Sequence, residues 1–259
     1  MRSTFRELPV SPIVMFGLRR SNGSRLYLRL AQVWVSMKVV SASDSSLLIV
    51  LGDVTSLDNH ERVMSLFRAL HRLNDPRIRN LHPAYASVLI DFDPLRLSHV
   101  EAASLVENLA GEKSSQHDLA ANIVTIPVCY DIEFGPDLQE VANHAKIPMR
   151  EVIRLHSSAT YRVHFLGFTP GFAYLGGLPE RLHVPRLATP RKHVPAGSVA
   201  IAGSQAGIYP VDSPGGWRLI GRTPVRIFDP DATQPTRLNP GDLVEFSEID
   251  RATFDATDR

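Results

Sequence analysis

The stretch GFTPGFAYLGGLPERLHVPR, residues 167–186, holds three prolines, four glycines and four aromatic or histidine rings within twenty residues. Proline fixes φ and lacks a backbone N–H, while glycine reaches positive φ without steric cost. Such a mixture suits neither a helix nor a central strand. The stretch therefore requires fixed turns and close backbone approach, as at the edge of a site or at a corner of a β fold.

Proline and glycine are concentrated in the same half of the chain. Eleven of the 19 prolines lie within residues 170–240, and ten of the 16 glycines lie within residues 167–221. Short β-rich runs such as YRVHFLGF, GSVAIAG, GIYPV and DLVEFSEI alternate with these breaks, which indicates a closed barrel or sandwich of short strands. We expect this β domain over residues 159–250, with a tail over residues 251–259.

The first half has regular hydrophobic periodicity instead. MKVVSAS and SLLIVLG are β-rich runs, and IRNLHPAY and SVLIDFD form a second pair. Residues 57–73 have helical spacing, and Ser98 with Glu101 forms a capping box that begins another helix. The run NIVTIPVCY closes the set. This order predicts a small ferredoxin-like α/β sandwich over residues 37–130, and thus an α+β protein.

Between the two halves, residues 131–158 have the spacing of two short helices joined by a tight turn. Their apolar positions are Leu138, Val141, Ala142, Ala145, Ile147, Val152 and Ile153. The pattern also suits a helix-turn-helix DNA reader, whose second helix would carry Arg150 and Arg154. We favour a helical linker pair packed on a domain, because the sequence has no wider basic surface and no supporting third helix.

Residues 1–36 carry six arginines and one acid, and their short apolar run precedes an arginine pair, the wrong order for a signal peptide. We expect a poorly ordered extension or a misassigned start, with Met37 as the true start; an arginine-rich targeting segment is the alternative. The net charge of +1 argues against affinity for nucleic acid or membranes, and no apolar run approaches a membrane span. The single cysteine, Cys129, fits a buried thiol in a reducing, cytoplasmic compartment.

Three stretches carry candidate chemistry. The rigid loop at residues 167–177 presents aromatic rings, and residues 181–194 hold six basic or histidine side chains without an acid, which suits a carboxylate or phosphate. Residues 197–221 combine special-backbone glycines with polar tips. Each stretch also has a purely structural alternative. The aromatic rings of the first would fill the core, and the basic side chains of the second and the polar side chains of the third would be solvated.

Several catalytic patterns are absent from the sequence. It contains no G-x-x-x-x-G-K-[ST] or G-x-G-x-x-G loop, no G-x-S-x-G elbow and no H-E-x-x-H pair. The ten histidines show no metal-ligand spacing, so we predict no bound metal or organic cofactor in this chain.

The run FLGFTPGFAYLGGLP, continued by PRKHVPAGSVAIAGSQAGIYPVDSPGGWRLIGRTP and RLNPGDLVEF, closely resembles the family of the 5-oxoprolinase B subunit. That family is also known as allophanate hydrolase subunit 1 or the KipI kinase-inhibitor family. The resemblance covers residues 37–250, including HPAYASVLIDFDP, and leaves residues 1–36 outside the pattern. It implies that the second domain is a cyclophilin-like β-barrel.

The resemblance also implies an activity. The chain would be one component of an ATP-dependent 5-oxoprolinase, inactive alone, that opens 5-oxo-L-proline to L-glutamate together with the A and C subunits. ATP with Mg²⁺ would act in the assembled complex, activating the lactam carbonyl toward water. The alternatives are a regulatory inhibitor of a sensor histidine kinase and a component of an allophanate- or urea-related amidohydrolase.

Carried onto this sequence, the family motifs give the candidate site. Arg186 and Arg191 would hold a carboxylate or phosphate, Gln205, Tyr209 and Ser213 would bind the ring amide, and His164 is the candidate for proton transfer. The remaining substrate-binding candidates are Phe168, Pro170, Gly171, Phe172, Gly203, Gly215, Gly216 and Trp217. We interpret residues 167–186 as the rim of a ligand pocket on the barrel, shared with a partner protein.

Overall fold

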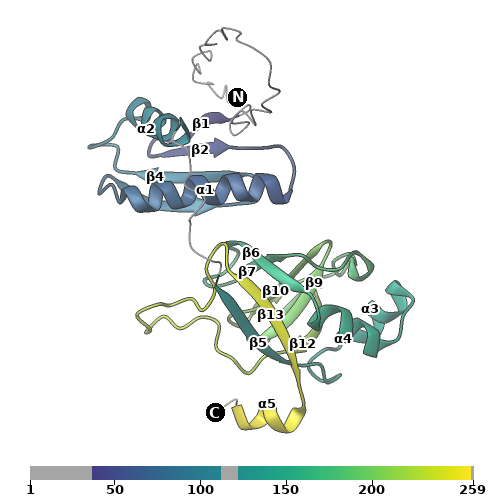
Figure 1. Cartoon of the computed structure of the whole chain (residues 1–259). Helices are drawn as coiled ribbons and strands as arrows, with labels where there is room; N and C mark the ends of the chain where they lie inside the picture. The colour runs from purple at the N-terminus through teal and green to yellow at the C-terminus, as the bar shows by residue number, and fades with distance from the viewer. Residues whose placement is uncertain (1–36, 112–121, 258–259) are drawn as a thin grey trace, which may run out of the picture. The chain divides into compact units, whose positions relative to one another are not determined.

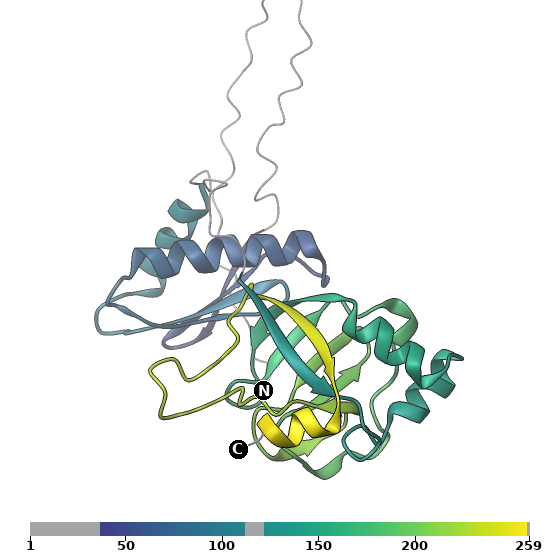
Figure 2. The same cartoon turned by 60° about the horizontal axis from the view of Figure 1, so that its bottom comes forward.

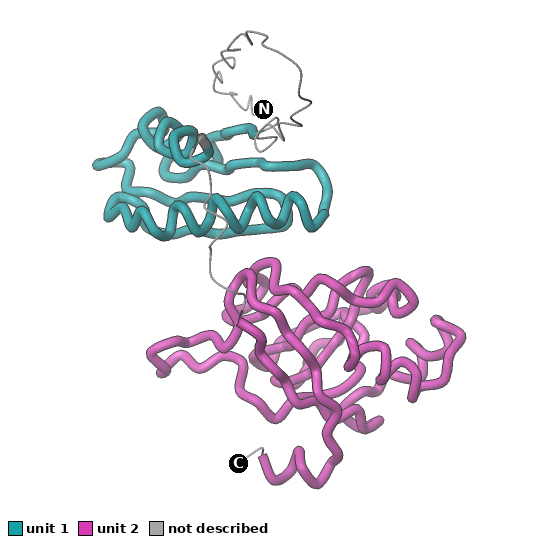
Figure 3. The backbone as a smooth tube through the Cα atoms, in the orientation of Figure 1, with its two compact units in different colours: residues 1–116 teal, residues 117–259 magenta. Residues whose placement is uncertain are grey.

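The computed structural model describes residues 37–111 and 122–257, so the predictions for residues 1–36 lie outside the described residues. The chain divides into two compact units, residues 1–116 and residues 117–259 (Figure 3). The described residues combine helices, open sheets and a closed barrel, which confirms the α+β class (Figure 1).

The first unit has one antiparallel sheet in the order β1-β2-β4-β3. Its described elements are β1 (Lys38–Ser43), β2 (Ser46–Val50), α1 (Leu57–Leu73), β3 (Ile78–Pro83), β4 (Ser87–Phe92) and α2 (His99–Gly111). Alternate residues of the strands, such as Leu47, Ile49, Val88 and Ile90, share one core with residues of both helices. Both helices therefore cover the same face of the sheet.

Both helices begin where the sequence provides caps. The Ser56 hydroxyl accepts a hydrogen bond from Asn59 N at 3.1 Å at the start of α1, and α1 ends at Asn74 in the left-handed conformation. At the start of α2, Ser98 N donates to Glu101 Oε2 at 2.8 Å, and Glu101 N donates to Ser98 Oγ at 3.3 Å. The predicted capping box is thus confirmed.

The strand Ile123–Cys129, expected to close this sheet, lies in the other unit, which corrects the predicted boundary at residue 130. A ferredoxin-like chain order, β-α-β-β-α-β, needs a strand after the second helix. Here the sheet position beside β2 is taken by β1, which precedes the first helix. The ferredoxin-like description is therefore not confirmed.

The second unit is a closed barrel with the strand order β10-β7-β6-β13-β5-β12-β9. Its strands are β5 (Ile123–Cys129), β6 (Thr160–Leu166), β7 (Ala173–Gly176), β9 (Ser198–Ala202), β10 (Gln205–Ile208), β12 (Arg218–Arg222) and β13 (Leu243–Ile249). A separate two-stranded ribbon consists of β8 (Arg191–Val194) and β11 (Ser213–Gly215). The predicted barrel is confirmed, and the description cyclophilin-like stays a prediction.

Strand β5 closes the barrel by pairing in parallel with β13 along its whole length, from Ile123 opposite Leu243 to Cys129 opposite Ile249 (Figure 2). The two strands are far apart in the sequence, so no local pattern indicates the pairing. Strand β5 also meets β12 through Cys129 and Arg222. Burial raises the pKa of the Cys129 thiol, as expected for a structural cysteine.

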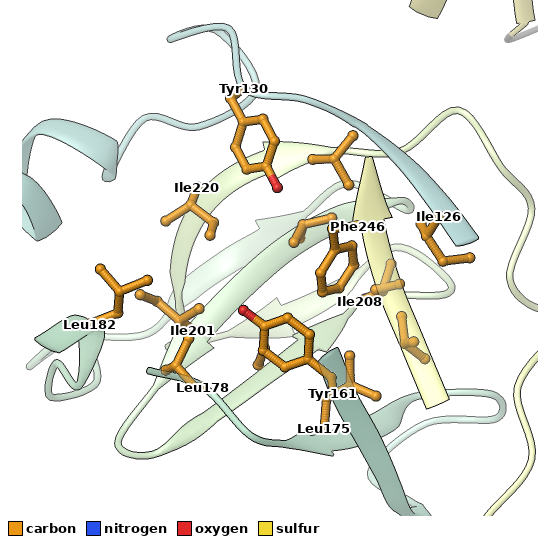
Figure 4. Packing of buried hydrophobic residues seen from close by; sticks show 14 of the residues in the cluster. Ile126, Tyr130, Tyr161, Leu175, Leu178, Leu182, Ile201, Ile208, Ile220 and Phe246 are labelled. Carbon is orange, nitrogen blue, oxygen red and sulfur yellow. The ribbon is translucent and has the colours of Figure 1, made fainter. Parts of the chain in front are cut away.

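The barrel interior is filled by side chains, including Ile126, Tyr161, Ile201 and Phe246 (Figure 4). His156 is fully buried beside them and stacks on Phe246 with the ring centroids 4.5 Å apart. Its Nδ1 lies 2.8 Å from the Tyr130 hydroxyl, and its carbonyl accepts a hydrogen bond from Tyr161 at 3.0 Å. The interior is a packed core rather than a ligand cavity.

The predicted helical pair is present as α3 (Leu138–Ala145) and α4 (Met149–Ser157). Its apolar positions Leu138, Val141, Ala142, Val152 and Ile153 belong to the barrel core, so the pair is part of the second unit rather than a separate linker. This packing is that of a structural helix pair.

The expected tail contains a helix, α5 (Arg251–Thr257), preceded by the cap Asp250, whose Oδ1 accepts from Thr253 N at 2.8 Å. Phe254 is buried and its ring centroid lies 4.4 Å from that of Phe134. Burial of this one ring attaches the helix to the barrel, which corrects the prediction of a plain tail.

Candidate functional site

A second cluster of rings lies on the outer face of the barrel. In β9, Val199 and Ile201 belong to the interior core, while Ala200 and Ala202 belong to this second cluster. Successive strand residues point to opposite faces, so the cluster lies outside the barrel wall. We call Phe168, Phe172, Tyr174, Tyr209 and Trp217 the outer aromatic cluster.

The rings of the outer aromatic cluster meet edge to face around Phe172. Its centroid lies 5.0 Å from Tyr174, 5.3 Å from Tyr209 and 5.5 Å from Trp217, with interplanar angles of 67°, 73° and 88°. This geometry is favourable for aromatic quadrupoles. Phe168 also meets Phe172 edge to face at 5.6 Å, so the structure brings together the four predicted site rings from separate segments of the sequence.

Two glycines make room for these rings. A Cβ on Gly207 would lie 2.9 Å from Phe172 Cζ and 3.1 Å from Trp217 Cζ3. A Cβ on Gly215 would lie 2.3 Å from the Tyr209 hydroxyl oxygen. The glycines of the motif therefore serve close packing of the rings against the backbone.

The loop that contains Phe168 is fixed by its own backbone. Gly167 N donates to Phe172 O at 3.0 Å, and Phe172 N donates to Thr169 O at 3.1 Å, so the turn closes on itself around the exposed Pro170. Phe168 has a φ of 69° and is 62% exposed, while Gly171 has a φ of 80°. A bulky residue with positive φ is uncommon, so the turn holds Phe168 outward at a conformational cost.

Arg186 lies at the edge of the outer aromatic cluster. Its Cζ is 5.8 Å from the centroid of Trp217, a cation–π distance, and it has no carboxylate partner among the described residues. Burial raises the pKa of the Tyr209 hydroxyl, which a hydrogen bond from the Trp217 backbone and the charges of Arg186 and Arg191 partly offset. An exposed guanidinium beside a neutral phenol can bind a carboxylate or phosphate.

Arg191 has a structural partner, which the sequence did not indicate. Its Nη2 donates to Oδ1 of the buried Asp137 at 2.7 Å, and Asp137 Oδ2 accepts from Leu219 N at 2.7 Å. Arg191 Nη1 and the Ser213 hydroxyl are buried and have no hydrogen-bond partner among the described residues. Arg191 therefore anchors the β8–β11 ribbon, and its role toward a ligand stays a prediction.

The other predicted residues have simpler environments. His164 is buried with its Nε2 against Gly176, where a Cβ would lie 2.0 Å away, and burial together with Arg162 lowers its pKa. Gly203, with a φ of 56°, lies in the turn between β9 and β10, and Gln205 is the first residue of β10, opposite Ala202. Gly216 accepts a hydrogen bond from Leu187 N at 2.7 Å. These placements leave their predicted roles as predictions.

A cavity of about 640 Å³ lies next to the predicted site in the barrel unit. Its lining comprises Ala196, Gly197, Pro210, Val211, Asp212, Arg222, Thr223, Pro224, Val225, Arg226, Ile227, Phe228, Pro230 and Thr257. None of the predicted site residues belongs to this lining. Phe228 of its wall lies close to Gly171, since a Cβ there would lie 2.8 Å from Phe228 Cβ, so the rigid loop packs against the cavity wall.

Sequence reasoning missed Arg222 and Arg226 as lining residues, while it included Asp212 among the polar side chains of residues 197–221. Arg222 lies in the run WRLIGRTPVRIFD, which reads as an ordinary strand with scattered charges. The available signal was the position of Arg222 directly before the Thr223-Pro224 break, where a strand ends and its last side chain reaches a barrel rim. Within residues 37–111 and 122–257, no group of three potential metal ligands gathers, and no helix is both long and apolar enough to cross a membrane.

Comparisons with known proteins fit this architecture. Residues 37–238 match the family model described as carboxyltransferase domain, subdomain C and D. The B subunit of 5-oxoprolinase from Bacillus subtilis is 36% identical over 232 residues, which cover 86% of this chain and 97% of the relative. The B subunit of 5-oxoprolinase from Haemophilus influenzae is 40% identical over 217 residues, covering 81% and 97%.

More distant and longer proteins also match. The urea amidolyase of Saccharomyces cerevisiae is 25% identical over 265 residues, covering 85% of this chain but 14% of that protein. The crystal structure of TTHA0988 superposes with a TM-score of 0.71 at 38% identity, covering 79% of this chain and 40% of that one. The near-complete match to the two bacterial 5-oxoprolinase proteins decides the assignment. The chain therefore belongs to the family of the 5-oxoprolinase B subunit.

Proposed function

We propose that the chain is one component of an ATP-dependent 5-oxoprolinase that opens 5-oxo-L-proline to L-glutamate together with the A and C subunits. One observation carries the proposal: the chain matches 97% of the length of the curated 5-oxoprolinase B subunit of Bacillus subtilis. A shared module inside a larger protein would give partial coverage, whereas this match extends over both units of the fold.

The chemistry explains why ATP is needed. The lactam carbonyl is a poor electrophile in an unstrained five-membered ring. Transfer of the γ-phosphoryl group to the lactam oxygen gives ADP and a good electrophile. Water then adds to the former carbonyl carbon, the ring C–N bond breaks, the nitrogen takes up a proton, and a second water releases the phosphate. The products are glutamate, ADP and phosphate.

The residues of this chain suit binding more than nucleotide chemistry. The sequence has no phosphate loop, so we assign ATP and Mg²⁺ to the assembled complex. Arg186, held over Trp217, supplies a guanidinium for a phosphate group, and the Tyr209 hydroxyl stays protonated as a hydrogen-bond donor. The exposed Phe168 on its rigid turn is the contact that we assign to a partner protein.

The test is ATP-dependent glutamate release from 5-oxoproline by the full chain, with and without candidate A and C subunits. We expect release only in the complete mixture. Arg186→Gln should raise KM for ATP about tenfold or more, because a charge-assisted hydrogen bond to a phosphate group is lost. Lys192→Gln, an exposed basic residue after the same loop, is the matched control and should leave KM unchanged.

No release from any combination of folded proteins would contradict 5-oxoproline as the substrate. The weak match to urea amidolyase makes allophanate or urea the next substrates to assay in the same mixture. Inhibition of a sensor histidine kinase stays a prediction of the family resemblance, tested by copurification with such a kinase.

A further inference from the structure

The 640 Å³ cavity beside the predicted site is formed by four segments of the barrel unit. They are the turns that follow β8 and β10, the segment that follows β12, and the end of α5. Its volume falls within the range of small-molecule sites. Proline, valine, isoleucine and phenylalanine side chains form much of the wall, and the charged lining residues are Asp212, Arg222 and Arg226.

Arg222 is held in place without a carboxylate. Its Nε donates to Ala196 O at 2.9 Å, and its Cζ lies 5.8 Å from the ring centroid of Phe134 and 5.9 Å from that of Phe254. These contacts occupy Nε and the flanks of the guanidinium. No hydrogen-bond acceptor meets its two Nη groups among the described residues. They are therefore available to an oxyanion, which an arginine fork binds through two parallel hydrogen bonds.

Neighbouring arginines of the same unit differ in this respect. Arg191 pairs with Asp137, Arg218 with Glu140, and Arg251 with Glu133 and Asp255. Arg226, the second arginine of the cavity, bonds Asp229 at 3.3 Å. Arg222 is thus a half-buried arginine that faces a cavity and forms no ion pair within the described residues, while its charge contributes to lowering the pKa of the nearby Asp212.

The surroundings keep Arg222 in this position. Gly197 has a φ of 81°, and a Cβ there would lie 2.4 Å from Thr223 O and 3.6 Å from Arg222 Nε. Any side chain would therefore displace the strand end that carries Arg222. Asp212, on the cavity wall, is fixed by Ala196 N at 2.7 Å and by His193 Nε2 at 3.0 Å. It offers an acceptor for an N–H group of a ligand.

We propose that this cavity binds a small molecule that carries one oxyanion, with the two Nη groups of Arg222 as the donors. The shared chemistry is that of a carboxylate or a phosphate. A compact carboxylate with an N–H group suits the pairing of Arg222 with Asp212, and 5-oxoproline has this form. The existence of the site is independent of the proposed function, but this choice of ligand rests on it.

The test is calorimetric titration of the full chain with three separate probes: 5-oxoproline, ATP and inorganic phosphate. We expect 5-oxoproline to bind, and Arg222→Gln to weaken its binding about 10- to 100-fold. Arg218→Gln is the matched control, since it makes the same change on the same strand outside the cavity lining and should change Kd less than about twofold. Val211→Trp fills the rim while keeping Arg222, and should also abolish binding.

Binding of ATP or phosphate with the same response to the variants would support the oxyanion site and identify its ligand as a phosphate rather than a carboxylate. Binding of none of the probes, or binding that Arg222→Gln and Val211→Trp leave unchanged, would overturn the proposal. Should Arg222→Gln fail to fold, Val211→Trp decides alone. Intact binding without glutamate release from the complete mixture would contradict the proposed function and leave the site standing.

Discussion

The inside and the outer face of the barrel both contain clusters of aromatic rings, but they differ in which polar groups have partners. Inside, the hydroxyls of Tyr130 and Tyr161 both bond His156, whose Nε2 alone of these groups lacks a partner among the described residues. Outside, buried Ser213 Oγ has no partner in the described residues, and Arg186 has no counter-charge there. Each region thus has a buried polar atom without a partner among the described residues, and the outer face differs by the exposed guanidinium of Arg186, which leaves binding capacity there.

The largest expected effect tests the interior. Phe246→Ala removes the ring that stacks on His156 and meets Tyr161 edge to face at 5.1 Å. We expect a loss of about 4 kcal/mol in the free energy of unfolding, since such truncations leave a cavity. Urea denaturation followed by fluorescence measures it. A loss below about 1 kcal/mol would mean that the interior is not the stabilising core.

Arg191→Ala tests whether the ribbon on the outer face is structural. The substitution leaves the buried carboxylate of Asp137 with one backbone donor and no counter-charge. We expect a loss of about 3 kcal/mol in unfolding free energy. The double variant Arg191→Ala with Asp137→Asn should recover part of this loss, and an additive further loss would argue against the ion pair as the cause.

Gly215→Ala tests the fit of the rings on the outer face. The new Cβ would collide with the Tyr209 hydroxyl oxygen, so we expect a loss of about 2 kcal/mol from overpacking. Gly216→Ala is the matched control, because its Cβ would meet Pro190 at an ordinary 3.6 Å. Equal melting temperatures for the two variants would contradict the close fit at Gly215.

The pH dependence of stability tests the interior again, with a smaller effect per unit of pH. Burial lowers the pKa of His156 to about 3 from 6.5, so the unfolded chain binds a proton that the folded chain does not. The contribution of the neutral His156 ring to the free energy of unfolding is fully present above pH 6.5. It decreases as the pH falls toward 3, by at most about 1.4 kcal/mol per pH unit.

Comparison of His156→Gln with the wild type isolates this effect. The variant should flatten the slope of unfolding free energy between about pH 6.5 and about pH 5. His144→Gln, an exposed histidine on α3, should keep the slope of the wild type. The same slope for all three proteins would contradict the assignment to His156.

The smallest effect on stability belongs to the exposed ring. Phe168→Ala removes a side chain that is 62% exposed, so we expect a change below about 0.5 kcal/mol in unfolding free energy. The same variant should weaken association with the C subunit in analytical ultracentrifugation, as the partner contact requires. Unchanged association would remove Phe168 from the partner interface.

Local signals in the sequence located many elements of the fold. The periodicity of residues 57–73 coincides with helix α1, and the pair Ser98 and Glu101 marks the start of α2. Each depends on residues three or four positions apart, which is the range over which helix patterns are readable. The sequence did not show which sheet β5 belongs to, because its partner β13 comes much later in the chain, after the other barrel strands.

The same division holds for the candidate site. Glycine, proline and aromatic spacing identified the loop around Phe168 and the motif of Tyr209 and Trp217, since these residue types have their own backbone and packing demands. Arginine has no such backbone or packing requirement, so sequence analysis named Arg191 as a candidate binding residue and did not identify Arg222. Only the fold shows that Arg191 pairs with Asp137 and that Arg222 faces a cavity.

The sequence by itself determined the family, the positions of helices α1 to α4 and the rigid glycine–proline turns, because these depend on residue type and short spacing. The tertiary structure decided which strands close the barrel, which face each ring lies on, and which charged groups have partners. Those features depend on contacts between residues far apart in the chain, and the burial that assigns each arginine its role exists only after folding.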